Sequence, residues 1–305
     1  MNSFITRNFS ILFLWGIALS SQGLELEPRR WSHIPIGTNF IGGGHARTDG
    51  DIIFDPVLRA EDVEMEMDTW LFKYIRSFEL ANRSASLSLT QAHHNATWSG
   101  LLDGVPTTVH RVGLSDPILR LAINLKGAPP LSGKEYLTYR ARQDIETIVG
   151  AGLSLQLPVG EYLDDKLLNF GSNRFTIRAR LGVVHKRGKW SMEMTGAGWF
   201  YTDNDDFFNG NELEQDPLFT LQGHLIHTFR SGVWAGLSMG YAYGAEATVN
   251  GVEKDDRKRN AAWALSYGFP LAPGVSAKIG YVGTRTRAST GLDSDSIVIA
   301  VSTFW

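Results

Sequence analysis

The sequence predicts an all-β fold: an antiparallel up-and-down transmembrane β-barrel of about twelve strands, with short periplasmic turns and long extracellular loops. Three observations predict it. Segments of roughly ten to fifteen residues alternate between apolar side chains and small or polar ones, as strands with two different faces do. The connections between the segments are alternately short and long. The final segment, "DSIVIAVSTFW", ends in Phe304 and Trp305, where a soluble domain usually has a polar tail.

The first element is a predicted secretory signal peptide, residues 1–23. Arg7 supplies a positive start, "FSILFLWGIALSS" is a short apolar run, and "SQG" offers a small-x-small cleavage site. A buried N-terminal helix is the alternative reading. The barrel domain would then be residues 24–305, in which no apolar run reaches the length of a membrane-spanning helix.

The clearest strand is "VWAGLSMGYAYGAEAT", residues 233–248. Its odd positions, such as Leu237, Met239 and Tyr241, are apolar, and its even positions are mostly small. A strand points successive side chains to opposite faces, so the odd positions would meet lipid and the even positions the lumen. The same pattern places strands near residues 32–46, 63–78, 84–97, 110–126, 147–158, 174–187, 189–202, 218–230, 233–248, 260–271, 275–287 and 295–305.

The connections indicate which end of the barrel is which. "LANR", "RGK", "RSG" and "PLAPG" are short, whereas "TDGDIIFDPVLRAED", "WSGLLDGVPTTV", "PVGEYLDDKLLNFGSN", "TDNDDFFNGNELEQDP", "VNGVEKDDRKRN" and "STGLDSD" are long and polar. In outer-membrane barrels the short turns are periplasmic and the long loops extracellular. One connection on the periplasmic side is long, and we expect a short helix there, near residues 132–143.

Composition excludes several classes. The net charge of −3 argues against a nucleic-acid partner, and the absence of cysteine excludes disulfides and thiol catalysis. A soluble β-sandwich or lipocalin-like barrel also alternates, but it has no reason to carry aromatic residues such as Trp190, Tyr267 and Trp305 near strand ends. The strand that ends in Phe304 and Trp305 resembles the signal read by the barrel assembly machinery. We therefore expect the outer membrane of a Gram-negative cell, with its lipid as a partner.

The inward face carries charges of both signs, which must be hydrated or paired inside a narrow lumen. We expect ion-pair ladders, with Arg178 and Arg180 beside Glu193, which either stiffen the wall or select what passes. Small residues such as Gly150 and Gly152 leave room for a channel or for an inward-folded plug, for which "NFGSNRF" and "IGTNFIGGGHARTDG" are candidates. The candidate lumen or substrate-path residues are Asp116, Arg120, Arg178, Arg180, Glu193, Gln222, His224, Glu246 and Lys278, with Glu64, Glu66, Asp68 and Lys126 as further inward charges.

The loops and histidines offer weaker signals. The loop candidates are Asn173, Arg174, Asp205, Phe207 and Phe208. The acidic loop 203–216 either binds calcium or is simply solvated, and because it lacks the EF-hand spacing no metal site is predicted. His224 is the best candidate for a catalytic base, but no nucleophile set accompanies it, so we interpret it as a hydrogen-bonding lumen residue and predict no catalytic residue and no cofactor.

From Gly113 to Trp305 the chain resembles the meta-pathway phenol-degradation family, a group of transporter-like outer-membrane barrels. The resemblance rests on "GLSDPILRLAINLKGAPPL", "LPVGEYLDDKLLNFGSNRF", "TDNDDFFNGNELEQDPLFTLQGHL" and the Trp305 terminus. It implies a barrel that passes small hydrophobic or aromatic molecules. Two other hypotheses stay open: an outer-membrane enzyme acting on lipid, and a structural barrel with a closed lumen.

Overall fold

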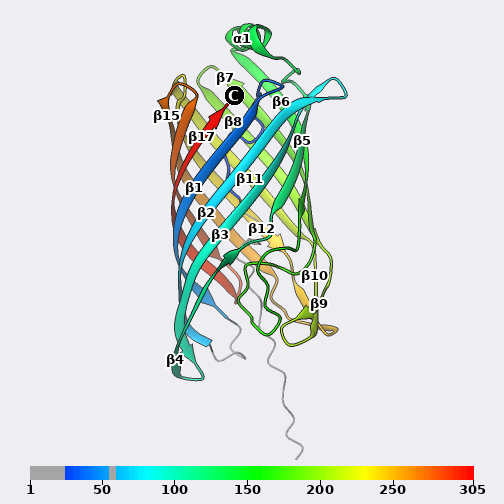
Figure 1. Cartoon of the computed structure of the whole chain (residues 1–305), viewed down its shortest axis with the longest axis vertical. Coiled ribbons are helices and arrows are strands. Elements are labelled where there is room, and N and C mark those ends of the chain that lie inside the picture. Colours follow the sequence, from blue (N-terminus) through cyan, green and yellow to red (C-terminus); the bar gives the residue numbers. More distant parts are fainter. Residues whose placement is uncertain (1–24, 55–59) are drawn as a thin grey trace, which may run out of the picture.

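The computed structural model describes residues 25–54 and 60–305, so the predicted signal peptide lies outside the described residues. Strands run obliquely around a common axis and close on themselves (Figure 1). The strands of the wall are β1 (Asn39–Ile53), β2 (Ala60–Leu80), β3 (Arg83–Leu102), β4 (Val105–Leu114), β5 (Ile118–Lys126), β6 (Ile145–Gln156), β7 (Thr176–Arg187), β8 (Trp190–Tyr201), β11 (Leu218–Arg230), β12 (Val233–Gly244), β15 (Lys258–Ala272), β16 (Val275–Thr286) and β17 (Gly291–Phe304).

The sheet is antiparallel throughout and closed. β1 pairs with β17 from Phe40↔Phe304 to Ile53↔Gly291, and with β2 on its other side. β4 and β5 both pair with β3, so they are two halves of one wall strand interrupted at Ser115–Pro117. The wall therefore has twelve strands, and the predicted up-and-down barrel is confirmed.

The outer surface carries an apolar belt. Leu237, Met239 and Tyr241 on β12 and Ile297 and Ile299 on β17 are all exposed to the outside of the barrel, as predicted. The even positions of β12 face inward; Ser238, for example, is fully buried. In water such a belt would be strongly unfavourable, because apolar surface is excluded from water. A bilayer covers it.

β2 shows where lipid begins. Its outward row changes from Glu64 and Glu66 to Trp70 and Phe72 along the strand, while Met67 faces inward and is buried. The expectation that Glu64, Glu66 and Asp68 face the lumen is therefore wrong: beyond the bilayer the strand faces water, and these carboxylates lie outside, where Glu66 and Asp68 bind Arg47 at 2.5 and 2.9 Å. The apolar partners of β2 at this height belong to a core containing Met65, Trp98 and Phe170.

Several predicted loops are extended hairpins. β3 and β4 are joined by a two-residue turn, Asp103–Gly104, in which both residues have positive φ (51° and 75°), as a tight hairpin requires. "WSGLLDGVPTTV" is thus paired strand and not a long loop. The acidic loop forms β9 (Asn204–Phe207) and β10 (Asn211–Gln215), which join β13 (Ala247–Val249) and β14 (Val252–Glu253) in a second sheet of four strands.

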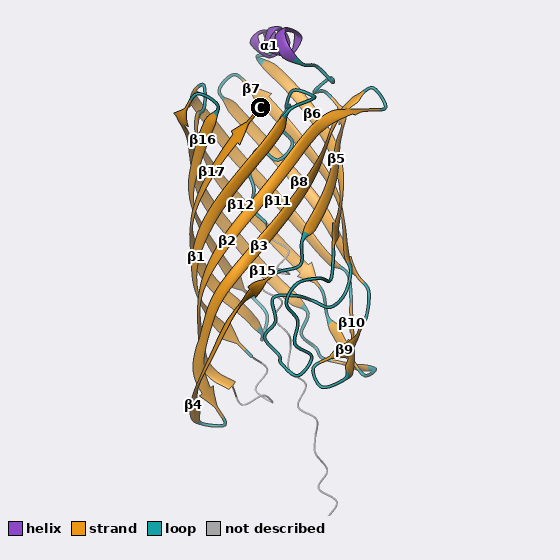
Figure 2. Cartoon of the chain, viewed as in Figure 1, coloured by secondary structure: helices purple, strands orange, loops and turns teal. Residues whose placement is uncertain are grey.

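The other end of the barrel has short turns, such as Ala81–Asn82 and Gly188–Lys189, and one helix, α1 (Gly133–Arg142), in the range expected for it. Figure 2 shows α1 and the C-terminus at this end, opposite β4, β9 and β10. Because short turns mark the periplasmic side, we call this the periplasmic end. Within the described part of the chain, no helix is both long and apolar enough to cross a membrane.

Candidate functional site

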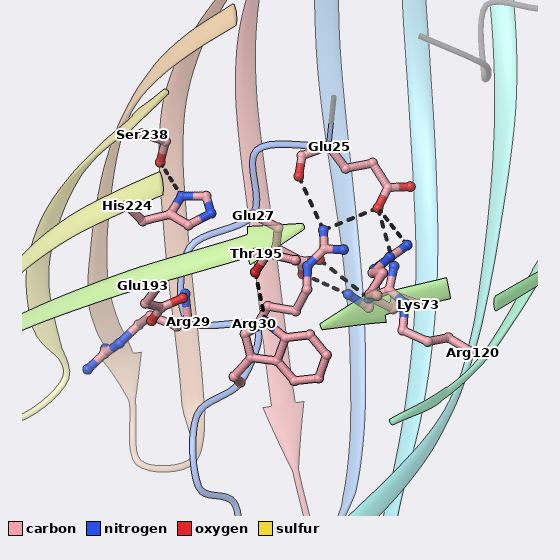
Figure 3. A network of polar contacts seen from close by, with 12 residues as sticks. Glu25, Glu27, Arg29, Arg30, Lys73, Arg120, Glu193, Thr195, His224 and Ser238 are labelled. Carbon is pink, nitrogen blue, oxygen red and sulfur yellow. Dashed lines mark hydrogen bonds and ion pairs between the residues drawn. The ribbon is translucent and has the colours of Figure 1, made fainter. Parts of the chain in front are cut away.

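The first described residues are not part of the wall. Residues 25–38, here called the lumenal segment, run inside the barrel (Figure 3). They reach its periplasmic rim, where His33 and Ile36 bond to the connection that carries α1 and the chain turns into β1. The predicted strand at 32–46 is therefore wrong in its first half, and of the two predicted plugs "IGTNFIGGGHARTDG" lies mostly in the wall. Ser77 fixes the turn: its hydroxyl accepts a hydrogen bond from Thr38 N (3.0 Å) and donates to Pro35 O (2.6 Å), while Gly37 takes φ +78°.

Trp31 anchors the lumenal segment against the wall. Its side chain is 3% exposed, and its indole Nε1 donates to Thr195 Oγ1 at 2.9 Å. The ring lies directly on Gly150 and Gly182, where an added Cβ would come within 2.2 and 2.1 Å of indole atoms. Gly150 on β6 and Gly182 on β7 thus leave room for the indole ring, and a larger side chain at either position would occupy that space.

Glu25 and Glu27 enter a group of cations from several wall strands (Figure 3). Glu25 lies 3.1 Å from Arg178, 3.3 Å from Arg120 and 3.6 Å from Arg180. Glu27 binds Lys73 at 2.7 Å. Arg30, on the lumenal segment itself, lies 3.2 Å from Glu25 and 3.3 Å from Glu27. Of the predicted lumen residues, Lys278 on β16 also lies near Glu27.

Arg178, Arg180 and Glu193 do not pair with one another as we expected. The β7–β8 register sets Arg180 opposite Ala197 and Glu193 opposite Val184, so the carboxylate lies farther towards the periplasm. Glu193 instead accepts a hydrogen bond from the backbone N–H of Arg29 at 3.0 Å. Arg178 stacks over Trp199 with its guanidinium carbon 3.8 Å from the ring centroid. The arginines of the wall are thus compensated by the lumenal segment.

His224 and Gln222 both face inward on β11 and are buried. Nδ1 of His224 lies 2.8 Å from the hydroxyl of Ser238 on β12. Glu193 is the register partner of His224 on β8, but its carboxylate accepts a hydrogen bond from the backbone N–H of Arg29 and not from the imidazole. Ser238 is fully buried, so its hydroxyl is not presented to a substrate.

Asp116 fixes an extracellular loop instead of lining an open path. It sits in the break between β4 and β5, where its carboxylate accepts from Gly160 N (2.9 Å), Ser172 N (2.9 Å), Ser172 Oγ (2.5 Å) and Gln156 Nε2 (3.1 Å). These bonds hold the loop 157–175 inside the mouth. There Phe170 stacks on the inward-facing His94 with centroids 5.0 Å apart, so "NFGSNRF" does fold inward.

The loop candidates fall into two groups. Asn173 donates to Asn204 Oδ1 at 2.9 Å, and Arg174 binds Gln215 and stacks over Tyr201, so both tie the loop 157–175 to the second sheet and to β8. Asp205 is exposed on β9, and Phe207 is buried. Phe208 lines an apolar cavity at the extracellular end. In the described residues no three His, Asp or Glu side chains gather as a metal site.

Glu246 differs from its predicted place in the lumen. It lies after the end of β12 and pairs with the exposed Arg257, which sits beside the outward-facing Tyr243. Sequence reasoning missed Glu25, Glu27, Arg30, Trp31 and Lys73. For the four residues of the lumenal segment the missed signal was proline: Pro28 and Pro35 flank Trp31, and proline cannot donate to a ladder within a central strand.

A closed antiparallel barrel of twelve strands, with a lipid-facing belt outside and charged residues inside, defines an outer-membrane β-barrel protein. The chain belongs to the family described as "Putative MetA-pathway of phenol degradation", whose profile matches residues 42–293. The predicted family and the outer-membrane location are confirmed.

Solved structures show the same fold. The COG4313 outer membrane channel from Pseudomonas putida F1 is 18% identical, with a TM-score of 0.75, 92% of this chain covered and 100% of that one. The transport unit of the autotransporter AIDA-I from Escherichia coli is 7% identical, with a TM-score of 0.52 and 93% and 95% covered. At sequence identities this low, the similarity shows a shared fold only. Among curated proteins the sequence finds no match.

Proposed function

We propose that this protein is a passive outer-membrane channel for small hydrophobic or aromatic molecules, closed in the described state by its lumenal segment. The observation that carries the proposal is an apolar cavity of about 350 Å³ at the extracellular end. The family description, which names phenol degradation, and the channel named among the similar structures support it.

The cavity lies between the β3–β4 hairpin, the loop 157–175 and the turn after β9. Trp98, Val109, Leu168 and Phe208 give it apolar walls, and Arg111 is among its few charged residues. A pocket of mostly apolar surface with a few polar groups suits a flat ring with a polar substituent. Phe170, which contacts Trp98, joins this region to the interior of the barrel.

Binding of 1-naphthol tests the cavity. The protein in lipid nanodiscs is titrated by naphthol fluorescence, with protein-free nanodiscs subtracted. Leu168→Asp should weaken binding at least tenfold, because a carboxylate in an apolar pocket must be desolvated. The matched control is Leu163→Asp, on the same loop but 42% exposed and not among the residues that line the cavity. Equal affinity of the two variants would contradict an apolar binding site here.

Liposome swelling in arabinose tests the passage. Wild-type protein should swell liposomes slowly, and deletion of residues 25–36 should raise the rate, because the deletion removes the segment inside the lumen. If neither protein exceeds protein-free liposomes, the third hypothesis, a structural barrel with a closed lumen, is correct.

The His224–Ser238 pair is the one observation that favours an enzyme. Against it, Ser238 is buried, and Glu193 accepts its hydrogen bond from Arg29 N, so within the described ranges no third group orients the imidazole. We therefore propose a non-enzymatic protein. Lipid hydrolysis by wild-type protein that His224→Ala abolishes would reverse this assignment.

A further inference from the structure

We propose that the cations around Glu25 form a binding site for the carboxylate of a small aromatic acid, and that Glu25 occupies this site while the barrel is closed. The site, here called the basic cluster, consists of Arg30, Lys73, Arg120, Arg178 and Arg180. The inference rests on the proposed function in one respect only, namely that the ligand reaches the cluster along the same lumen.

The basic cluster has more positive charge than its partners neutralise. Five cations face two carboxylates, Glu25 and Glu27, which leaves an excess of three positive charges in the interior of the barrel. Charge confined in a low-dielectric space attracts counter-ions strongly. An additional anion therefore lowers the electrostatic energy of the cluster.

The guanidinium groups also keep unused hydrogen-bond donors. The side chains of Arg178 and Arg180 are only 3% and 2% exposed. Among the described residues, neither terminal nitrogen of Arg180 donates a hydrogen bond, and neither does Nε of Arg120 or of Arg178. Leaving buried donors without an acceptor is energetically costly, and a carboxylate can accept two hydrogen bonds at once from one guanidinium group.

Glu25 is the replaceable member of this arrangement. Its side chain is 39% exposed, whereas the arginines that it meets are held inside strands paired on both sides. It also belongs to the lumenal segment and not to the wall. When the segment moves, Lys73, Arg120, Arg178 and Arg180 stay in place on the wall, whereas Glu25 leaves together with Arg30.

Space for a ligand lies beside the cluster. A cavity of about 140 Å³ between the lumenal segment and the wall is bordered by Arg120 and Arg180 and, on its apolar side, by Trp31, Ile34 and Ile75. Charged donors at one side and an indole face at the other match a carboxylate attached to a flat ring.

Benzoate and its neutral analogue benzyl alcohol test the proposal by equilibrium dialysis against the full-length protein in nanodiscs. Glu25→Gln should bind benzoate at least tenfold more tightly than wild type, because the competing carboxylate is gone, and benzyl alcohol should bind both alike. The matched control is Glu66→Gln, which removes a carboxylate paired with Arg47 on the outer face. Arg180→Gln, introduced into Glu25→Gln, should abolish the gain, and Arg180→Lys should restore part of it.

The outcomes separate this site from the channel. If benzoate binds Glu25→Gln no more tightly than wild type or Glu66→Gln, or if benzyl alcohol gains equally, the basic cluster is not a carboxylate site, even where naphthol binds and liposomes swell. Because dialysis needs no conduction, charge-dependent benzoate binding by a barrel that never swells liposomes would support the site and refute the channel.

Discussion

Trp31 offers the sharpest test of what holds the lumenal segment inside the barrel. In Gly182→Ala the new Cβ would lie 2.1 Å from Trp31 Nε1 and 2.5 Å from Cε2, well inside van der Waals contact. β7 cannot retreat, because it is paired with β6 and β8 along its whole length. The indole must therefore leave its seat and lose its bond to Thr195.

The size of the effect follows from what the indole loses. Removing a buried aromatic side chain from its packing costs about 3–5 kcal/mol, and the hydrogen bond about 1 kcal/mol more. Allowing for partial relaxation, we take about 3 kcal/mol, which shifts the equilibrium between the docked and released segment about 100-fold.

The assay exploits the absence of native cysteine. Ser88, on β3, is 6% exposed and lines the cavity under the lumenal segment. In a Ser88→Cys background the rate of maleimide labelling reports the released fraction, so Gly182→Ala should raise it about 100-fold. Gly196→Ala is the control, since nothing lies within 4 Å of a Cβ there. If Gly182→Ala labels no faster than Gly196→Ala, Trp31 does not hold the segment.

Three further predictions concern the ends of the barrel. Asp116→Asn should weaken the docking of loop 157–175 by about 2 kcal/mol and so speed proteolysis of this loop about 30-fold. The control is Asp165→Asn at an exposed position of the same loop, which should leave the proteolysis rate unchanged. Burial lowers the pKa of His33, whose Nε2 donates to Pro129 O, so the docked segment should lose stability as pH falls below about 6.5; conductance should rise at pH 5.5, but not in His33→Gln. Trp305→Ala should reduce the heat-modifiable, folded protein in outer membranes if the terminal aromatic guides assembly, while secretion continues.

The wall could be predicted because lipid imposes one rule on every strand: apolar positions outside, anything else inside. That rule placed Leu237, Met239 and Ile299 correctly from their parity alone. The rule failed where a strand extends beyond the bilayer. At the extracellular height of Glu64 and Glu66 the outer face meets water, so the same parity carries charge, and periodicity does not reveal where along a strand the bilayer stops.

Only part of the site, the cations on the wall, could be predicted from the sequence. The cations Arg120, Arg178 and Arg180 are visible from the sequence because charge on an inward row is unusual. Their partner, Glu25, is not, because the contact with Arg178 joins residues 153 positions apart and belongs to a segment without periodicity. The expected pairing of Arg180 with Glu193 failed because of strand register: Glu193 lies opposite Val184, out of reach of Arg180.

The covalent bond between the lumenal segment and β1 at Asn39 has a consequence for how the barrel responds to solutes. A released Glu25 remains within about fourteen residues of the rim, a span of about 50 Å at most, so its effective concentration stays in the millimolar range. A diffusing acid must reach comparable abundance, or bind more strongly, to keep the tethered carboxylate away. If the basic cluster binds acids as proposed, the attachment point sets the concentration of acid below which Glu25 keeps its place in the cluster.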